Sequence, residues 1–187
     1  MRLFVALDIP EDVRRHIADF SLELRRHAPR ARWARIESAH VTLKFIGERP
    51  PGELGPLRAA IEPVRAPSPI EIEFRGAGFF RNDRQPRVLW AGVHASAALA
   101  ELAADIERRL APLGIPLESR PFAPHLTLAR FNDPSESGDL RQVIAGAGLR
   151  EFGRTVTREF HLYESRRAPE GSIYTRLETV VFARETP

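Results

Sequence analysis

Two segments of the sequence place a histidine and a threonine in the same order, and these side chains suit chemistry on a phosphate ester. Residues 40–42 are His-Val-Thr and residues 125–127 are His-Leu-Thr. In-line displacement at a phosphodiester needs a proton taken from the nucleophile on one side and a proton given to the leaving oxygen on the other. Two imidazoles can divide these tasks, and hydroxyls can donate hydrogen bonds to the non-bridging oxygens. The pattern predicts acid-base catalysis by His40 and His125, with Thr42 and Thr127 binding the phosphate.

A strand at each segment would bring these groups onto one face. Residues 40–45 alternate polar and apolar side chains. We therefore expect Val41, Leu43 and Phe45 to face the core, and His40, Thr42 and Lys44 to face the other way. Leu126 and Leu128 give the second segment the same pattern. The histidine and threonine of one strand would project from the same face, roughly 6.7 Å apart. If the two strands face each other, two imidazoles and two hydroxyls converge.

The elements around the two segments also occur twice. Arg2 and Arg87, Ala6 and Ala91, and Leu43 and Leu128 are each 85 residues apart, as are the two histidines and the two threonines. In each half a buried strand, over 2–8 and over 87–93, precedes a helix with one apolar face. The apolar faces are formed by Val13, Ile17, Phe20 and Leu24 and by Leu99, Leu102, Ile106, Leu110 and Leu113. We expect a single bilobal domain over residues 1–187, built from an internal repeat of approximately 1–80 and 85–165.

The remaining pattern indicates the fold class. We expect a helix over 53–64, a strand over 70–74, a weak helix over 140–147, and strands over 155–164 and 173–182 joined by a turn at Pro169-Glu170-Gly171. Short turns between several elements favour antiparallel pairing over a doubly wound parallel sheet. The expected class is α+β, with two antiparallel-rich sheets related by a pseudo-two-fold axis, helices packed outside and a central active-site cleft.

Composition excludes several kinds of site. The 187 residues are 43% hydrophobic and 28% charged, as in ordinary globular proteins, and they include no cysteine. Disulfides, cysteine-ligated zinc, iron-sulfur clusters and thiol nucleophiles are therefore excluded. The other histidines, at 16, 27, 94 and 161, lack the spacing of a zinc site, and no glycine-rich nucleotide-binding motif occurs. We expect neither a metal nor a cofactor.

The charge of the chain permits a phosphate-bearing partner. The formal net charge is +3, and Lys44 is the only lysine among the 28 basic residues. Arginine can bind phosphate through two parallel hydrogen bonds, so an RNA or nucleotide partner fits, although coding bias would produce the same composition. No apolar run is long enough for a signal peptide or a membrane span. We expect a soluble, cytoplasmic monomer without a membrane partner.

Several parts of the sequence resemble one protein family. They are His40-Val41-Thr42-Leu43-Lys44-Phe45-Ile46-Gly47, Pro124-His125-Leu126-Thr127-Leu128-Ala129-Arg130, the opening Met1-Arg2-Leu3-Phe4-Val5-Ala6-Leu7, Pro86-Arg87-Val88-Leu89-Trp90, and the stretch from Leu162-Tyr163-Glu164-Ser165 through Gly171 and Tyr174. Together they are similar to the two-histidine (2H) phosphoesterase superfamily, and within it to the RNA 2′,3′-cyclic phosphodiesterases, once named 2′-5′ RNA ligases. The resemblance implies a bilobal fold with both histidines in a central cleft.

The resemblance also implies a reaction. RNA 3′ ends or nucleotides bearing a 2′,3′-cyclic phosphate would be hydrolysed to 2′-phosphates without a metal, with His40 protonating the departing O3′ and His125 activating water. The symmetry of the site allows the reverse assignment of the two histidines, and 2′-5′ RNA ligation would be the reverse reaction. Arg130 would help to bind the phosphate. In an ideal strand Arg130 points away from His125, so a bulge or a strand end must intervene.

Two other functions stay open at this point. One is a non-catalytic nucleotide- or RNA-binding module that keeps the cleft. The other is a phosphodiesterase that acts on 2′-5′ oligoadenylate or another small cyclic phosphate. The two H-x-T segments favour an enzyme, because a binding module has no need for both imidazoles.

Overall fold

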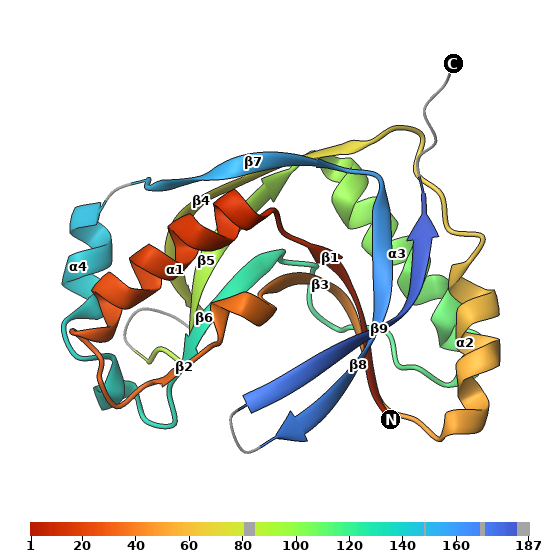
Figure 1. The fold of residues 1–187 in the computed structure, drawn as a ribbon, viewed down its shortest axis with the longest axis horizontal. Coiled ribbons are helices and arrows are strands. Elements are labelled where there is room, and N and C mark those ends of the chain that lie inside the picture. Colours follow the sequence, from red (N-terminus) through yellow and green to blue (C-terminus); the bar gives the residue numbers. More distant parts are fainter. Residues whose placement is uncertain (81–84, 148, 169–170, 183–187) are drawn as a thin grey trace.

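Two antiparallel sheets form the centre of the molecule, and helices cover their outer faces (Figure 1). The computed structural model describes residues 1–80, 85–147, 149–168 and 171–182. Within these residues the smaller sheet has the strand order β3-β1-β8-β9, and the larger sheet has the order β2-β6-β5-β4-β7. The expected α+β fold class is therefore confirmed.

The helices and strands are short, and most follow one another closely along the chain. The strands are β1 (Arg2–Asp8), β2 (Arg32–Trp33), β3 (His40–Glu48), β4 (Ile70–Phe80), β5 (Val88–Ala95), β6 (His125–Arg130), β7 (Glu151–Thr157), β8 (Glu159–Ala168) and β9 (Gly171–Val181). The helices are α1 (Glu11–Arg25), α2 (Leu54–Ile61), α3 (Ala97–Leu110) and α4 (Leu140–Ala147). Within the described ranges, no helix is long and apolar enough to cross a membrane.

The two long helices form where the apolar spacing predicts them. α1 begins directly after Pro10, and Glu11 and Asp12 in its first turn complement the positive end of the helix dipole. Its apolar face is buried against β7 of the larger sheet, where the rings of Phe20 and Phe152 lie 5.2 Å apart. α3 buries its own apolar face beside β3 of the smaller sheet. Each helix thus covers the sheet that does not contain the strand preceding it.

Strands are also exchanged between the two halves of the chain. β4 comes from the first half but lies between β5 and β7, and β8 comes from the second half but pairs with β1. The expectation of one strand over 155–164 is wrong for this reason. The chain leaves the larger sheet at the end of β7, passes Arg158 and enters the smaller sheet as β8. Of the expected turn at 169–171, residues 169 and 170 lie outside the described residues.

A bulge occurs at the same place in β3 and β6. Ala6 pairs with Thr42 and Val5 with Lys44, which leaves Leu43 as an extra residue in β3. In β6 the extra residue is Leu128, which is 85 positions later. A bulge inserts one residue into one strand and shifts the alternation of the side chains that follow.

This bulge overturns the expected directions of Lys44 and Phe45. Lys44 is 3% exposed and points into the protein, whereas Phe45 is 45% exposed. The Nζ atom of Lys44 lies 2.5 Å from Oε1 of Glu107 on α3 and 2.7 Å from the carbonyl oxygen of Pro116. Residues before the bulge keep the expected directions, so His40 and Thr42 stay on the face opposite Val41.

Candidate active site

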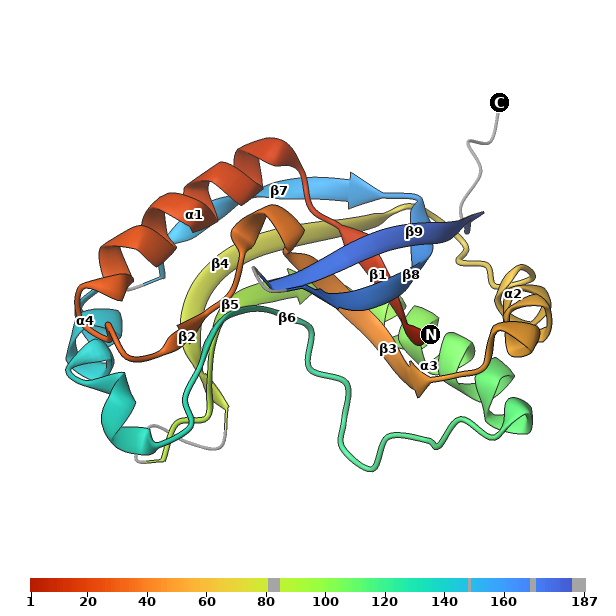
Figure 2. The same cartoon turned by 60° about the horizontal axis from the view of Figure 1, so that its bottom comes forward.

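The five residues singled out by the sequence line one cavity. β3 and β6 approach each other in the middle of the molecule, as Figure 2 shows. The cavity between them has a volume of about 380 Å³. His40 and Thr42 of β3 and His125, Thr127 and Arg130 of β6 line it. Val41 and Leu126, which alternate with these residues, are fully buried and anchor both strands in the core.

Both imidazoles are held in the same orientation. Nδ1 of His40 lies 2.9 Å from the carbonyl oxygen of Ser38, and Nδ1 of His125 lies 2.8 Å from the carbonyl oxygen of Ala123. A carbonyl oxygen can only accept a hydrogen bond, so Nδ1 donates in both rings and Nε2 is left to gain or lose a proton. Ser38 and Ala123 are 85 residues apart, so the correspondence between the halves includes the support of each ring.

Burial lowers the pKa of both histidines, because an imidazolium loses hydration in the cleft. The nearby charges differ between the two rings. The carboxylate of Asp8 raises the pKa of His40, whereas the guanidinium of Arg130 lowers the pKa of His125. Asp8 therefore stabilises the imidazolium form of His40, although Arg14 and the ring of His125 lower the pKa of His40.

Aromatic side chains pack around His40. The ring of Phe4 stacks on the imidazole with 4.5 Å between centroids, and the ring of Tyr174 meets it edge-on at 5.1 Å. Tyr163 stacks on Phe4 at 5.3 Å. The ring of His125 meets Phe80 edge-on at 4.6 Å. These contacts fix the plane of each imidazole. A fixed plane keeps Nε2 pointing in one direction, as proton transfer to or from a positioned substrate requires.

Asp8 is itself held in place by its neighbours. It pairs with His40 in the register of β1 and β3. Its Oδ1 accepts a hydrogen bond of 2.5 Å from the hydroxyl of Tyr163, and its Oδ2 accepts one from Arg176. Burial and the bond to Asp8 raise the pKa of Tyr163 to about 12, so this hydroxyl stays protonated near neutral pH. The network keeps a negative charge beside His40.

Arg130 reaches the cavity because of the bulge at Leu128. Thr127 pairs with Trp90 and Ala129 pairs with Leu89, so Arg130 returns to the face that carries His125. The requirement for a bulge is thus confirmed. The hydroxyls of Thr42 and Thr127 line the same cavity, and neither has a hydrogen-bond partner among the residues described. They are available to a bound phosphate.

Arg32 is a site residue that the sequence did not single out. It lies on β2 directly opposite Arg130 on β6, and both side chains line the cavity. Like charges at directly opposed positions destabilise a pair of strands. An anion between the two guanidinium groups would remove that repulsion, so this pairing indicates an anion-binding site.

The other side chains near the histidines gave weaker signals in the sequence. Phe4, Tyr163 and Tyr174 lie in the segments that resemble the 2H family, but their types suggested no role. Asp8 and Arg32 carry no motif. Within the described residues, no group of three or more histidine, aspartate or glutamate side chains is placed to hold a metal ion.

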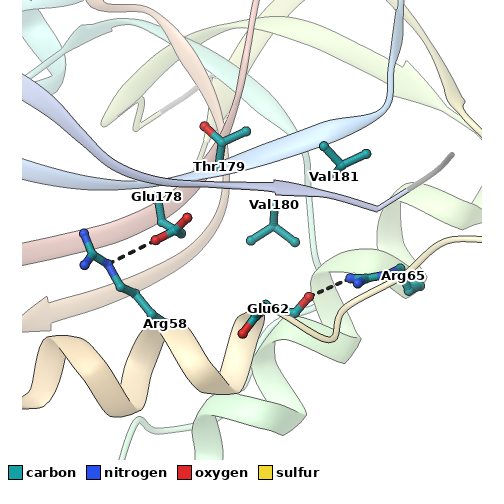
Figure 3. A pocket seen from close by; sticks show the side chains of 7 residues that line it. All are labelled: Arg58, Glu62, Arg65, Glu178, Thr179, Val180 and Val181. Atoms are coloured by element: carbon teal, nitrogen blue, oxygen red, sulfur yellow. Dashed lines mark hydrogen bonds and ion pairs between the residues drawn. The ribbon is translucent and has the colours of Figure 1, made fainter.

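A cavity of similar volume on another face is chemically different. It measures about 360 Å³ and lies between α2 and β9 (Figure 3). Its arginines are already engaged: Arg58 is 3.2 Å from Glu178, and Arg65 donates to the carbonyl oxygen of Glu62 at 2.6 Å. None of the described residues that line it is a histidine. The histidines and threonines predicted from the sequence line the cavity between β3 and β6 instead.

Comparisons with known proteins show which sequences and structures this chain resembles. The RNA 2′,3′-cyclic phosphodiesterase of Methanothermobacter thermautotrophicus is 31% identical over 179 residues, which are 95% of this chain and 97% of that protein. The RNA 2′,3′-cyclic phosphodiesterase of Geobacillus stearothermophilus is 38% identical over 128 residues, which are 68% of this chain but 41% of that protein. The crystal structure of TT0787 of Thermus thermophilus superposes with a TM-score of 0.80 at 31% identity and covers 100% of both chains.

A family model matches most of the chain as well. Residues 9–169 fit the model of the 2′-5′ RNA ligase superfamily, and this range contains both H-x-T segments and Arg130. With the paired histidines, the two sheets and the full-length relatives, this match makes the chain a member of the 2′-5′ RNA ligase superfamily.

Proposed function

We propose that this protein hydrolyses the 2′,3′-cyclic phosphate at the 3′ end of an RNA and leaves a 2′-phosphate. One observation carries the proposal: His40 and His125, each with Nδ1 tied to a carbonyl oxygen, line one cavity beside two unpartnered threonine hydroxyls. The relatives named RNA 2′,3′-cyclic phosphodiesterase support the choice of substrate.

In the proposed reaction one proton moves on each side of the phosphorus. Nε2 of neutral His125 takes a proton from water, and the water oxygen forms a bond to phosphorus. The bond between phosphorus and O3′ breaks, and Nε2 of protonated His40 gives its proton to O3′. The phosphate stays on O2′. The two histidines have then exchanged protonation states, which solvent restores.

The surrounding charges support this division of roles. Asp8 favours the imidazolium form of His40, which must start protonated. Arg130 favours the neutral form of His125, which must start as a base. On these two contacts we propose His40 as the acid and His125 as the base.

The remaining groups are placed to stabilise the charge on the phosphate. Thr42 and Thr127 donate hydrogen bonds to its non-bridging oxygens, and Arg130 and Arg32 supply positive charge. These guanidinium groups take the place that a cation has in other phosphodiesterases and would repel one, so we propose that the reaction is metal-independent.

The same site would also form RNA linkages. With the 5′-hydroxyl of a second RNA in place of water, attack on the cyclic phosphate gives a 2′-5′ bond, and hydrolysis prevails where water is abundant. We propose a monomeric enzyme of the cytoplasm, since the cysteine-free sequence suits a reducing compartment.

The test is to incubate the protein in excess EDTA with a short RNA that ends in a 2′,3′-cyclic phosphate and to identify the product. We expect a 2′-phosphate. Replacing His40 or His125 with alanine should lower kcat by about 10² to 10⁴, the usual span for one general acid or base. Binding of the RNA without turnover, a 3′-phosphate product, or near wild-type turnover by a folded alanine variant would contradict the proposal.

A further inference from the structure

A larger cavity continues from the catalytic one and carries only positive charge. Its volume is about 730 Å³, and it shares His40, Thr42, Arg32 and Arg130 with the catalytic cavity. Beyond these residues it extends to Arg2 and Phe45 and to Arg167 at the end of β8. Among the described residues that line it there is no aspartate or glutamate.

The arginines of this cavity differ from those that form ion pairs on the rest of the surface. Arg58, Arg150 and Arg166 lie 3.2, 2.8 and 2.9 Å from carboxylate oxygens of Glu178, Glu23 and Glu164. In contrast, Arg2 and Arg167 have no carboxylate within ion-pair distance in the described parts of the chain. Guanidinium groups gathered without counter-charges favour an anionic ligand.

Phe45 gives the same cavity an exposed aromatic surface. The bulge at Leu43 turns this ring outward, and the guanidinium of Arg2 lies 4.9 Å above its centroid. Bases of single-stranded RNA stack on aromatic rings and on flat guanidinium groups. In β6 the position equivalent to Phe45 is Arg130, so one strand offers charge to the reacting phosphate and the other offers a stacking surface next to it.

The catalytic cavity and the larger cavity differ in the size of ligand that they can hold. The catalytic cavity, at about 380 Å³, is near the lower end of the roughly 300 to 1,000 Å³ that small-ligand pockets span. Thr42 pairs with Ala6 and Phe45 with Phe4, so Phe45 lies two residues of β1, roughly 7 Å, farther along the sheet. An RNA with a cyclic phosphate at its 3′ end continues only from O5′ of its last nucleoside, so it needs a single exit groove.

We propose that this larger cavity binds the penultimate nucleotide of an RNA chain, with the phosphodiester contacted by Arg2 and Arg167 and the base stacked on Phe45 and the guanidinium above it. The inference rests on the proposed function, because it places the reacting end of the same RNA at His40 and His125. The preferred substrate is then an oligonucleotide, and a nucleoside 2′,3′-cyclic phosphate is a poor one.

Another groove leads away from the histidines, but it suits a phosphate backbone less well. It has a volume of about 980 Å³, and its lining includes Phe45, Phe80 and Phe122 as well as Arg87 and Arg120. Glu107 and Glu118 also line it. Carboxylates repel phosphates, so the groove with Arg2 and Arg167 is the better path.

Binding of RNA products tests the inference without relying on turnover. Calorimetry would compare uridine 2′-phosphate with the uridine dinucleotide that ends in a 2′-phosphate. We expect the dinucleotide to bind the wild-type protein about tenfold more tightly, and Arg2→Gln or Arg167→Gln to reduce this advantage to about threefold or less. Each variant should also lower the slope of log Kd against log salt by roughly 0.7, the value for one phosphate of a single strand. Arg15→Gln, an exposed change on α1, should leave the advantage intact.

The base contact has its own test. A dinucleotide whose penultimate nucleotide lacks its base should bind the wild-type protein about fivefold or more weakly than the complete one, and Phe45→Ala should remove this difference. Equal affinity of the mononucleotide and dinucleotide for the wild type would overturn the inference. The inference would also be overturned if the dinucleotide kept its tighter binding in both Arg2→Gln and Arg167→Gln, or if it lost that tighter binding in Arg120→Gln instead. Absence of turnover with every cyclic phosphate would refute the proposed function, while the binding data would still decide the inference.

Discussion

His40 and His125 occupy equivalent positions on equivalent strands, yet their surroundings differ. Both have Nδ1 tied to a carbonyl oxygen two residues earlier in the chain. His40 is packed among Phe4 and Tyr174 beside Asp8, whereas His125 lies near Arg130. A duplicated motif therefore yields two chemically distinct groups, as a reaction with one acid and one base requires.

The lowered pKa values of His40 and His125 predict the pH at which the rate profile is centred. In the proposed reaction one histidine must be neutral and the other protonated, so we expect kcat/KM to follow a bell whose two limbs belong to the pair. In the free enzyme burial lowers the pKa of both rings from 6.5. The bell for kcat/KM should therefore be centred below pH 6.5. Bound phosphate favours the imidazolium form, so the bell for kcat should lie at higher pH. Steady-state kinetics from pH 4.5 to 8.5 would measure both, and a kcat/KM bell centred above pH 7 would refute this account.

The threonines allow a test of hydrogen bonding against packing. Thr→Ser at position 42 or 127 keeps the hydroxyl, and Thr→Val keeps the β-branched shape that a strand prefers. If each hydroxyl donates to a phosphate oxygen, the serine variants should keep most of the activity, and the valine variants should lose about tenfold or more in kcat/KM, as for a lost hydrogen bond to a charged group. Melting temperatures of all four variants provide the control. Active valine variants beside inactive serine variants would show that these side chains only pack.

At the level of elements, the sequence predicted most strands and helices because each depends on local spacing. The apolar faces of α1 and α3 are buried as expected, and the H-x-T segments lie on strands. The directions of Lys44 and Phe45 were wrong because a bulge depends on pairing with β1, which no pattern within residues 40–48 records. The break between β7 and β8 was missed for a similar reason. Residues 155–164 are continuously extended apart from Arg158, and only the partners of each strand separate them.

Prediction of the site residues from the sequence has the same limit. Residues that repeat between the halves, His40, Thr42, His125 and Thr127, could be found by comparing the sequence with itself. Asp8 and Arg32 occur once and reach the cavity through the pairing of β1 with β3 and of β2 with β6. Their positions at the cavity depend on tertiary structure, and no repeat in the sequence marks them.

Lys44 links three elements around the bulge, and its removal should be costly. Its side chain is 2% exposed, and it binds Glu107, Glu118 and the carbonyl oxygen of Pro116. Lys44→Met leaves the carboxylate of Glu107 partly buried without its partner, so we expect a loss of about 3 kcal/mol in the free energy of unfolding. Arg150→Gln breaks an exposed pair with Glu23 and should cost less than about 1 kcal/mol. Urea denaturation would compare the two variants, and equal losses would contradict the role given to Lys44.

The pH dependence of the Lys44 cluster follows from Glu107. Burial raises the pKa of this carboxyl, but the hydrogen bonds from Lys44 and from the amide of Glu118 outweigh it and lower the pKa below 4.5. A lowered pKa in the folded state means that the contribution is fully present above pH 4.5 and is lost as the pH falls through the folded value. The difference between wild type and Lys44→Met should accordingly shrink below pH 4.5.

At the scale of the whole molecule, one buried and two partly buried histidines should make folding sensitive to mild acid. Burial lowers the pKa of His40, His125 and His161 from 6.5 in the folded protein. Below that pH the unfolded chain binds more protons than the folded one, so stability falls as the pH decreases and is fully present above about pH 6.5. Urea midpoints at pH 7.5 and 5.5 would measure the loss. Saturation with uridine 2′-phosphate should reduce it, because the bound phosphate favours protonated histidines in the cleft. Unchanged midpoints between these pH values would contradict the prediction.

The exchange of β4 and β8 between the two sheets has a consequence for the order in which the protein can fold during its synthesis. β1 leaves the ribosome long before β8, which is one of its two neighbours, so that Arg2 pairs with Ser165. Until residues 159–168 have been made, the nascent chain carries an unpaired edge on a strand whose residues Leu3 to Leu7 are all buried in the finished molecule. Such an edge can pair with other chains. The smaller sheet is thus completed only after β8 and β9 have been made, while β4, β5 and β6 of the larger sheet can pair earlier.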